Sequence, residues 1–360
     1  MDERACWLGF HLIPGIGAAA IARMIEAFGS LSAAWEADVA AFVDAGVNQK
    51  SATRLIELRS DIDLEREWDR VQKAGVTLLT LLDDAYPAML REIPSPPPVL
   101  YIKGEIRQED ETAIGIVGTR RMTRYGNEMA RRMSSGLAAA GMTIVSGLAR
   151  GIDGIAHREA IDAGGRTLAV LGCGVDRIYP SEHRRLSQDV TENGALISQF
   201  PLGTAPDAHN FPERNRLISG LSLGVLVVEA PMKSGALITS SYAADHGRTV
   251  FAVPGSALSS ASEGPHQLLR DGAVVAATVD DVLQELNLER RQAVMENRRM
   301  LPDATGDEQE ILKTLDGDPR HIDEIAIDTG INISQLSAML LQMQLKGMVR
   351  EVGGQHYARE

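Results

Sequence analysis

The sequence predicts an α/β protein whose centre is an extended Rossmann-like, doubly wound and mostly parallel sheet. Between residues 112 and 277, short runs rich in Val, Ile and Leu alternate with segments of helix length. The runs are continuously apolar, as expected for parallel strands that helices cover on both faces. The length of 360 residues exceeds that of a usual single domain, so we expect smaller domains on either side of this core.

The composition favours a cytoplasmic protein. The two cysteines, Cys6 and Cys173, lie far apart and lack the spacing of a metal site. The first residues carry charges of the wrong sign for a secretory signal, and no segment approaches the roughly 20 apolar residues of a membrane helix. We therefore expect no membrane contact.

Residues 1–75 read as short helices, and we expect a small helical domain of the SAM or helix-hairpin-helix type. The segment "IPGIGAAAIARMIEAFGS" has a tight turn followed by apolar residues at helical spacing. Such a turn can hold a DNA phosphate, but the match is short and the region is acidic. A module that serves only for packing is the favoured interpretation, and no internal repeat is evident.

Residues 76–111 contain "DDAYPAMLREIPSPPPVLYIKGEI", whose prolines suit an extended connector that docks on the core. The core takes residues 112–286. Its predicted strands are AIGIVG, MTIVSG, TLAVLG, ALISQF, GVLVVEA, RTVFAVPG and AVVA. In such sheets ligands bind beyond the carboxyl ends of the strands, where the arginine-bearing loops fall.

A linker and a winged-helix domain are expected after the core. Residues 287–305 are charged and show little apolar periodicity, which indicates a linker or an exposed helix. Residues 306–360 follow the winged-helix order of three helices and a two-stranded hairpin. They carry 5 basic and 10 acidic side chains. We expect this domain to contact protein or another part of the chain and not DNA.

The net charge of −13 argues by itself against nucleic acid as a partner. Its distribution weakens that argument. Residues 112–286 carry 16 basic and 17 acidic side chains, whereas residues 1–111 carry 11 and 19. Nonspecific DNA binding is penalised, but a confined basic site is compatible with this chain.

The stretch "GIVGTRRMTRYG" begins like a Rossmann phosphate loop and then has arginines where further glycines are expected. The glycine after the strand lets the backbone approach a ligand, and the following helix offers free N–H groups. Three arginines suit a multiply charged polyanion, although a solvated loop is the alternative. The candidate binding residues are Gly118, Thr119, Arg120, Arg121 and Arg124.

The stretch "SGLARGIDGIAH" repeats the combination of strand, glycine, arginine and helix. It makes Ser146, Gly147 and Arg150 candidates for the same site. Asp153 and His157 lie one helical turn apart, but no third ligand is in view. We expect a helix cap and a hydrogen-bonded histidine there.

The stretch "FPERNRLISGLS" places Phe211 beside Arg214, Asn215 and Arg216. An aromatic ring next to guanidinium groups suits single-stranded nucleic acid, whose bases can stack while its backbone meets positive charge.

The stretch "PMKSGALITSS" places Lys233, Ser234 and Gly235 at the start of a predicted helix. A cation at a helix N-terminus is unfavourable, so this lysine is either solvated or faces an anion. It is the only lysine between residues 112 and 286.

No catalytic motif is present. The sequence lacks G-x-S-x-G, H-E-x-x-H and G-x-x-x-x-G-K-[ST]. Glu229 could act as a base but has no evident partner, and Cys173 is of a type more often buried than nucleophilic. We expect no catalytic residue, no metal and no cofactor.

The chain resembles the DNA-processing protein A family (DprA, also called Smf) over nearly its whole length. The resemblance rests on "YPAMLREIPSPPPVLYIKG", "GIVGTRRMTRYG", "SGLARGIDGIAH", "GCGVDRIYP", "FPERNRLISGLS" and "EAPMKSGALITSSYAADHGRTVFAVPG". It implies a protein that is not an enzyme and that binds single-stranded DNA, commonly as a homodimer. Such proteins protect incoming strands in natural transformation and help load the RecA recombinase.

The resemblance implies a set of strand-binding cations, namely Arg120, Arg150, Arg214, Arg216 and Lys233. One departure concerns the loop before the last strand. The family usually has Gly-x-Asn-x-Leu there, whereas this chain reads "GPHQL" with His266 in place of the asparagine.

Two alternatives remain. A related Rossmann group cleaves nucleoside monophosphates with a P-G-G-x-G-T-x-x-E loop, but "PMKSGALITSS" lacks the glycine pair and the glutamate. A regulator that reads duplex DNA with its winged helix is disfavoured because the third helix of that domain has no arginine.

Overall fold

The computed structural model describes residues 2–287, 306–315, 319–345 and 348–359. The chain divides after Leu286 into two compact units, which are described separately. Apart from Asn287, the predicted linker lies outside the described residues.

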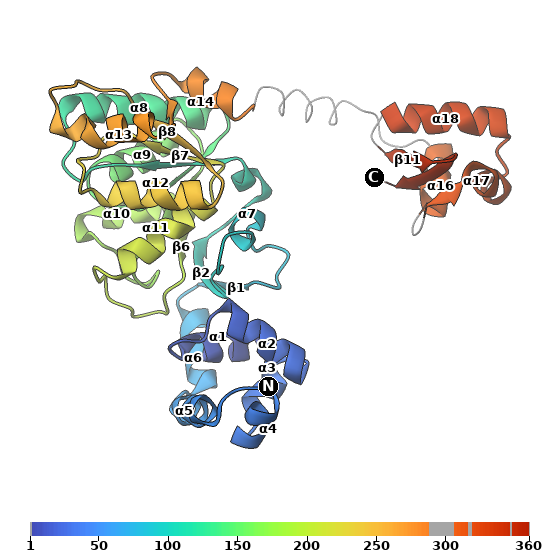
Figure 1. Cartoon of the computed structure of the whole chain (residues 1–360), viewed down its shortest axis with the longest axis horizontal. Coiled ribbons are helices and arrows are strands. Elements are labelled where there is room, and N and C mark those ends of the chain that lie inside the picture. The colour runs from blue at the N-terminus through green and yellow to red at the C-terminus, as the bar shows by residue number, and fades with distance from the viewer. Residues whose placement is uncertain (1, 288–305, 316–318, 346–347, 360) are drawn as a thin grey trace. The chain divides into compact units, whose positions relative to one another are not determined.

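The first unit is built on a nine-stranded sheet with the order β1-β2-β6-β5-β4-β3-β7-β8-β9 (Figure 1). The strands are β1 (Thr77–Thr80), β2 (Val99–Gly104), β3 (Ala113–Val117), β4 (Thr143–Ser146), β5 (Thr167–Val170), β6 (Gly194–Ser198), β7 (Gly224–Val227), β8 (Thr249–Ala252) and β9 (Val274–Val275). Strands β3 to β9 pair in parallel, whereas β1 and β2 are antiparallel to their neighbours. The predicted α/β fold, with its doubly wound and mostly parallel sheet, is confirmed.

Helices cover this sheet, because the central strands are apolar on both sides. All residues of β3, β4, β5, β6 and β7 are buried. The helices are α8 (Arg124–Ala139), α9 (Ile152–Asp162), α10 (Arg184–Glu192), α11 (Asn210–Gly220), α12 (Gly235–Asp245), α13 (Glu263–Arg270) and α14 (Val279–Glu285), with short turns η2 (Ser181–His183) and η3 (Ser260–Ser262). Helix α8 packs on α9, and α11 packs on α12, as the two layers of Figure 1 show.

The predicted connector, residues 76–111, belongs to the sheet itself. It supplies β1, β2, the short helix α7 (Ala88–Arg91) and the turn η1 (Gln108–Glu111). Strand β2 pairs with β6, from Tyr101 opposite Ser198 to Gly104 opposite Ala195. The prolines of this segment lie between the two strands, and Tyr86 and Leu90 pack in the core beneath them. The apolar run "VLYI" at the start of β2 is the sequence pattern that could have predicted this strand.

Residues 1–75 fold into α1 (Glu3–Leu12), α2 (Ala18–Phe28), α3 (Leu31–Glu36), α4 (Val39–Asp44), α5 (Gln49–Ser60) and α6 (Leu64–Lys73). Their core is not separate from that of the sheet. Phe10 and Trp35 meet edge to face with centroids 4.9 Å apart, and this apolar cluster continues through Tyr101 to Leu196.

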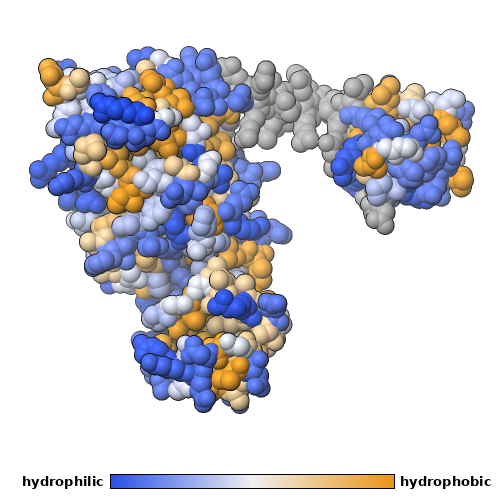
Figure 2. Space-filling model, in the orientation of Figure 1, coloured by the Kyte–Doolittle hydropathy of each residue, from blue (hydrophilic) through white to orange (hydrophobic). Residues whose placement is uncertain are grey.

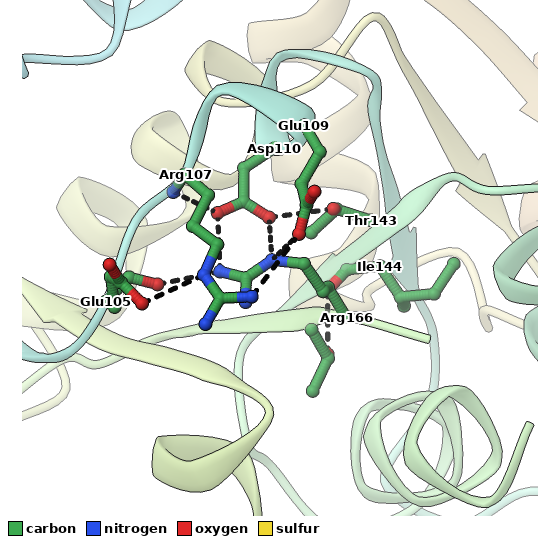
Figure 3. A network of polar contacts seen from close by, with 8 residues as sticks. Glu105, Arg107, Glu109, Asp110, Thr143, Ile144 and Arg166 are labelled. Carbon is green, nitrogen blue, oxygen red and sulfur yellow. Dashed lines mark hydrogen bonds and ion pairs between the residues drawn. The ribbon is translucent and has the colours of Figure 1, made fainter. Parts of the chain in front are cut away.

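A network of ion pairs closes the amino-terminal edge of the sheet (Figure 3). The Arg166 guanidinium, just before β5, donates from Nε and Nη2 to the two Asp110 carboxylate oxygens, each at 2.8 Å. Asp110 is 5% exposed and also accepts from the Thr143 hydroxyl at 2.8 Å. These contacts attach η1 to the starts of β4 and β5.

The second unit has the predicted winged-helix arrangement. Its elements are α16 (Gly306–Thr314), β10 (Arg320–His321), α17 (Ile322–Thr329), α18 (Ile333–Leu345), β11 (Val349–Gly353) and β12 (His356–Arg359). The strands form a small sheet in the order β10-β12-β11 over a core that includes Ile311, Leu336 and Leu340. No helix in the described ranges of either unit is long and apolar enough to cross a membrane.

Candidate nucleic-acid interface

The candidate site lies where the direction of the chain through the sheet reverses. Strand β3 has β4 on one side and β7 on the other. Successive crossovers lead away from β3 in opposite directions, which leaves a crevice at the carboxyl ends of these strands. The loops after β3, β4 and β7 all open at this crevice.

A groove of about 600 Å³ occupies the crevice. Of the predicted site residues it is lined by Gly118, Thr119, Arg120, Arg121, Phe211, Arg214, Asn215, Lys233, Ser234 and Gly235. A smaller pocket adjoins it, shares Arg120, Phe211 and Arg214, and adds Gly147 and Arg150. We call the two together the cationic groove. Residues from four separate motifs thus meet at one edge of the sheet.

The loop after β3 is held by Glu229, which is 2% exposed. The Thr119 amide donates to the Glu229 carbonyl at 2.7 Å. The Glu229 carboxylate accepts from the Thr123 amide at 2.9 Å and from the Thr123 hydroxyl at 2.6 Å. Glu229, considered above as a base, is therefore engaged in positioning this loop, and it leaves the arginines of the loop in solvent.

The loop after β4 contacts the first loop directly. The Ile152 amide donates to the Thr119 carbonyl at 3.3 Å, and Gly151 lies against the backbone of Thr119 and Arg120. Ser146 does not reach the groove. Its buried hydroxyl donates to the Ile116 carbonyl at 2.6 Å and so joins two strands.

His157 is the buried, hydrogen-bonded histidine that the sequence predicted. Its Nε2 accepts from the Leu148 amide at 3.2 Å, and its Nδ1 donates to the Thr167 hydroxyl at 2.7 Å. Burial lowers its pKa to about 3, so the ring is neutral. Asp153 does not cap its helix and instead accepts from the Gly147 amide at 3.2 Å. Burial raises the pKa of Asp153, against the opposing effect of Arg214.

Arg214 forms part of the floor of the cationic groove. It is 4% exposed, and its Nη1 donates to the Val170 carbonyl at 3.0 Å. Within the described residues its Nε has no hydrogen-bond partner, and no carboxylate forms an ion pair with it. Burial lowers the pKa of this guanidinium, with Asp153 opposing. Burying a guanidinium is costly, and the nearby buried Asp153 carboxylate offsets part of that cost, so an anion in the groove would offset more of it.

Phe211 lies between the exposed Arg120 and the buried Arg214 and contacts both guanidinium groups. The guanidinium carbons of Arg120 and Arg214 lie 5.3 and 5.8 Å from its ring centroid. Tyr179 was not predicted as a site residue, but it lines the adjoining pocket and is 40% exposed. The centroids of the Tyr179 and Phe211 rings are 6.1 Å apart. The motif "GCGVDRIYP" was the signal that could have found it.

The last part of the cationic groove is the start of α12. Ser234 caps this helix by accepting from the Ala236 amide, and a side chain added at Gly235 would meet only open space. Asn215 donates to the Gly235 carbonyl at 3.1 Å and so fixes α12 to α11. Lys233 is exposed beside this helix end.

Two of the predicted arginines are held by neighbouring groups. Arg150 is paired with Glu182 at the edge of the smaller pocket. Arg216 donates from Nη1 to the carbonyls of Pro94 and Ser95 at 3.1 and 2.6 Å, and it does not line the cationic groove. Arg216 therefore fastens the segment between β1 and β2 to α11.

Four of the predicted site cations are exposed at or beside the groove. No carboxylate in the described part of the chain pairs with Arg120, Arg121, Arg124 or Lys233. The first two and Lys233 line the cationic groove, while Arg124 is exposed at the start of α8 next to it. This edge of the sheet is locally positive although the whole chain is acidic.

Other reactive groups near the site are structural. Burial raises the pKa of Cys173 to about 11, so its thiol is a poor nucleophile. His266, at the position of the expected asparagine, contacts the Gly255 carbonyl at 3.1 Å and supports the loop before α13. No group of His, Cys, Asp and Glu among the described residues could hold a metal ion.

Known proteins share this fold and sequence. Residues 77–287 match the family described as DNA recombination-mediator protein A, and residues 296–355 match the DprA winged helix domain. Protein Smf of Synechocystis is 35% identical over 99% of both chains. The DNA processing protein DprA of Bacillus subtilis is 37% identical over 70% of this chain and 88% of its own.

Two solved structures are also similar. DNA processing protein A from Streptococcus pneumoniae has a TM-score of 0.69 at 33% identity and covers 79% of this chain and 98% of its own. DNA processing protein A from Helicobacter pylori, whose structure is described by its single-stranded DNA binding mode, has a TM-score of 0.54 at 29% identity. It covers 59% of this chain and 97% of its own. The fold, the family match over more than half of the chain and the long alignments together show that this chain belongs to the DNA recombination-mediator protein A family of DNA processing proteins, also called DprA or Smf.

Proposed function

We propose that the cationic groove binds single-stranded DNA. The observation that carries this proposal is the meeting, at one edge of the sheet, of exposed cations that have no ion-pair partner among the described residues, with the buried guanidinium of Arg214 beneath them. A polyanion neutralises several of these charges at once. The relative from Helicobacter pylori, described by its binding of single-stranded DNA, supports the same choice of ligand.

The proposed contacts are to phosphates and to base faces. Arg120, Arg121 and Lys233 meet phosphate oxygens, and the positive end of the α12 helix dipole adds to their attraction. Phe211 and Tyr179 offer rings on which bases stack. None of these groups forms a specific pattern with base edges, so binding is mostly independent of sequence.

We further propose that the protein protects incoming strands in natural transformation and helps load the RecA recombinase on them. The family's description as a recombination mediator supports this role. Because phosphates lie in the groove and most bases stay accessible, a recombinase could pair with the same strand. An assay of RecA filament formation on strands covered by single-strand-binding protein tests it, and no acceleration by the chain would refute it.

We also propose a cytoplasmic homodimer. Exposed apolar side chains on the β7–β9 side of the sheet support pairing, among them Ile238 on α12 at 41% and Val275 on the edge strand β9 at 51%. A surface of this kind suits a second copy of the chain. Sedimentation velocity measures the oligomeric state.

The proposed role needs no catalysis by this chain. The alternative is an enzyme that cleaves nucleoside monophosphates. The Glu229 carboxylate accepts two hydrogen bonds from Thr123, which disfavours it as the base of such an enzyme. Incubation with nucleoside monophosphates tests the alternative, because release of free base would support it.

The deciding experiment measures affinity for a single-stranded oligonucleotide over a series of salt concentrations. Each phosphate neutralised on a single strand contributes a slope of about −0.7 to the plot of log affinity against log salt. Arg120→Gln should weaken binding to all sequences alike and make the slope shallower by about 0.7. Arg216→Gln is the matched control, because its guanidinium is bound to carbonyl groups outside the groove.

An unchanged slope in the Arg120 variant, with wild-type affinity, would remove Arg120 from the site. Equal losses in both variants would mean that neither acts as a local phosphate contact. Preference for duplex over single-stranded oligonucleotides would contradict the proposed ligand.

A further inference from the structure

The helical region contains a structural repeat that the sequence did not make evident. The turns before α2 and α5 each have a glycine with positive φ, Gly15 at 88° and Gly46 at 86°. An apolar residue and then the N-cap of a long helix follow in both turns. The segments "GIGAAAIARMI" and "GVNQKSATRLI" correspond, and they start at positions 15 and 46. Few identities survive between them, which hides the repeat in the sequence.

The two repeats face each other across a groove of about 440 Å³, which we call the hairpin groove. Equivalent residues of both repeats line it. Met24 and Leu55, nine residues after the turn glycines, are each 5% exposed and belong to its floor together with the fully buried Phe42. Ile16 and Val47 follow the turn glycines and are only partly buried. Its floor is therefore apolar, and hydrophobic surface of this region is visible in Figure 2.

The charges of the hairpin groove differ from those around it. Residues 1–75 carry 8 basic and 12 acidic side chains, yet no carboxylate is among the lining residues in the described part of the chain. The cations that line it are Arg23 on α2 and Arg54 on α5, at equivalent positions of the two repeats. Both are exposed, and neither has an ion-pair partner within the described residues.

We propose that the hairpin groove docks an amphipathic helix of a partner protein, with an apolar stripe bordered by carboxylates on both sides. An apolar floor is filled by apolar side chains, as in other complexes in which a helix lies in a groove. One arginine stands on each wall, so carboxylates on both flanks of the stripe complement them. The hairpin groove shares no lining residue with the cationic groove, so the partner and DNA can bind to the same chain.

Nucleic acid fits the hairpin groove less well. A phosphate backbone does not fill an apolar floor. The turn "PGIG", which suggested a DNA phosphate, here serves as a wall of an apolar groove.

The test uses the full chain and two labelled peptides of about 16 residues, a length that gives a helix of four turns. One has a stripe of Leu at helical spacing with Glu on both flanks, and the other has Lys in place of each Glu. Fluorescence anisotropy measures their affinities. We expect the Glu peptide to bind at least tenfold more tightly than the Lys peptide. The double variant Arg23→Glu/Arg54→Glu should reverse this preference.

Two controls define the site. Arg66→Glu reverses an exposed cation on α6 that does not line the hairpin groove, and it should leave the preference unchanged. A third peptide, with Gln in place of Leu and Glu retained, should not bind, because it lacks the apolar stripe. Thermal unfolding shows whether each variant is folded.

Equal affinity for the Glu and Lys peptides, or the same loss of preference in the Arg66 variant, would overturn the proposal. Weaker binding of a duplex oligonucleotide in the double variant, without a peptide preference in the wild type, would also overturn it and identify a nucleic-acid contact. Neither outcome depends on the cationic groove, so the proposed function is tested separately.

Discussion

Single residues of the same type have different roles at this edge of the sheet. Arg120 and Arg216 both stand in motifs that suggested a DNA contact. Arg120 lies over Phe211 and lines the cationic groove, whereas Arg216 donates to two carbonyl groups of the segment between β1 and β2. Hydrogen-bond partners distant in sequence decide which guanidinium is available to a ligand.

His157 makes stability depend on pH. Its pKa is lowered by burial from 6.5 to about 3 in the folded chain. The unfolded chain therefore binds a proton that the folded chain does not, and stability is lost as pH falls below about 6.5. When the pH is lowered from 7 to 5, we expect the titration of His157 to decrease the free energy of unfolding by about 2 kcal/mol.

Chemical denaturation of the wild type and of His157→Gln at several pH values measures this contribution. The glutamine cannot be protonated, so the variant should lose less stability than the wild type as the solution is acidified. A difference between the two proteins that stays constant from pH 7 to pH 5 would contradict the assignment.

At the scale of elements, the loops after β3 and β4 form one unit at the site. Gly151 has φ of 78°, and a Cβ there would meet the backbone of Thr119 and Arg120. Gly151→Ala should cost about 1–3 kcal/mol of stability. It should also weaken binding of single-stranded DNA by tenfold or more, because it displaces the loop that carries Arg120.

Gly164→Ala is the control for backbone strain alone. Gly164 also has positive φ, at 74°, but nothing lies within 4 Å of an added Cβ. It should cost about 1–2 kcal/mol and leave DNA affinity unchanged. Equal DNA affinities for the two variants would show that the loops are not coupled.

The opposite edge of the sheet depends on the ion pair between Arg166 and Asp110 (Figure 3). Arg166→Leu leaves a buried carboxylate without its cation, which should cost about 3–5 kcal/mol of unfolding free energy. Urea denaturation measures the loss. The double variant Asp110→Asn/Arg166→Leu should recover part of it, because no unpaired charge remains. A single variant as stable as the wild type would exclude this role.

At the scale of the whole molecule, the sheet extends beyond residues 112–286, the core that the sequence predicted. Residues 112–286 contain all the predicted strands but lack β1 and β2, whose removal exposes β6 and the cores on both of its faces. We expect residues 1–286 to unfold cooperatively. They should bind single-stranded DNA within about threefold of the full chain, because all lining residues of the cationic groove lie in this unit. A threefold change in affinity corresponds to less than about 1 kcal/mol. Residues 112–286 should aggregate or unfold without a cooperative transition.

Expression of both fragments, with denaturation and binding measurements, tests this boundary. A large loss of affinity in residues 1–286 would mean that the acidic winged helix contributes to DNA binding. A stable, cooperative fragment 112–286 would show that β1 and β2 are dispensable.

The sequence by itself determined the α/β core, the winged helix and the loops from which the site is built. Continuous apolar runs predict parallel strands, and parallel strands bring their carboxyl ends to one edge, so Arg120 and Lys233 could be placed near each other without coordinates. These are consequences of local pattern and of the geometry of a sheet.

Only the tertiary structure decided which groups are free. Arg216 and Ser146 are engaged by partners outside their own motifs, Tyr179 reaches the groove from a separate loop, and β2 joins the sheet through pairing with β6. The repeat behind the hairpin groove became visible only when the two turns could be compared in three dimensions. The physical reason is that local pattern determines which elements form, whereas contacts between residues distant in the chain determine what each side chain meets.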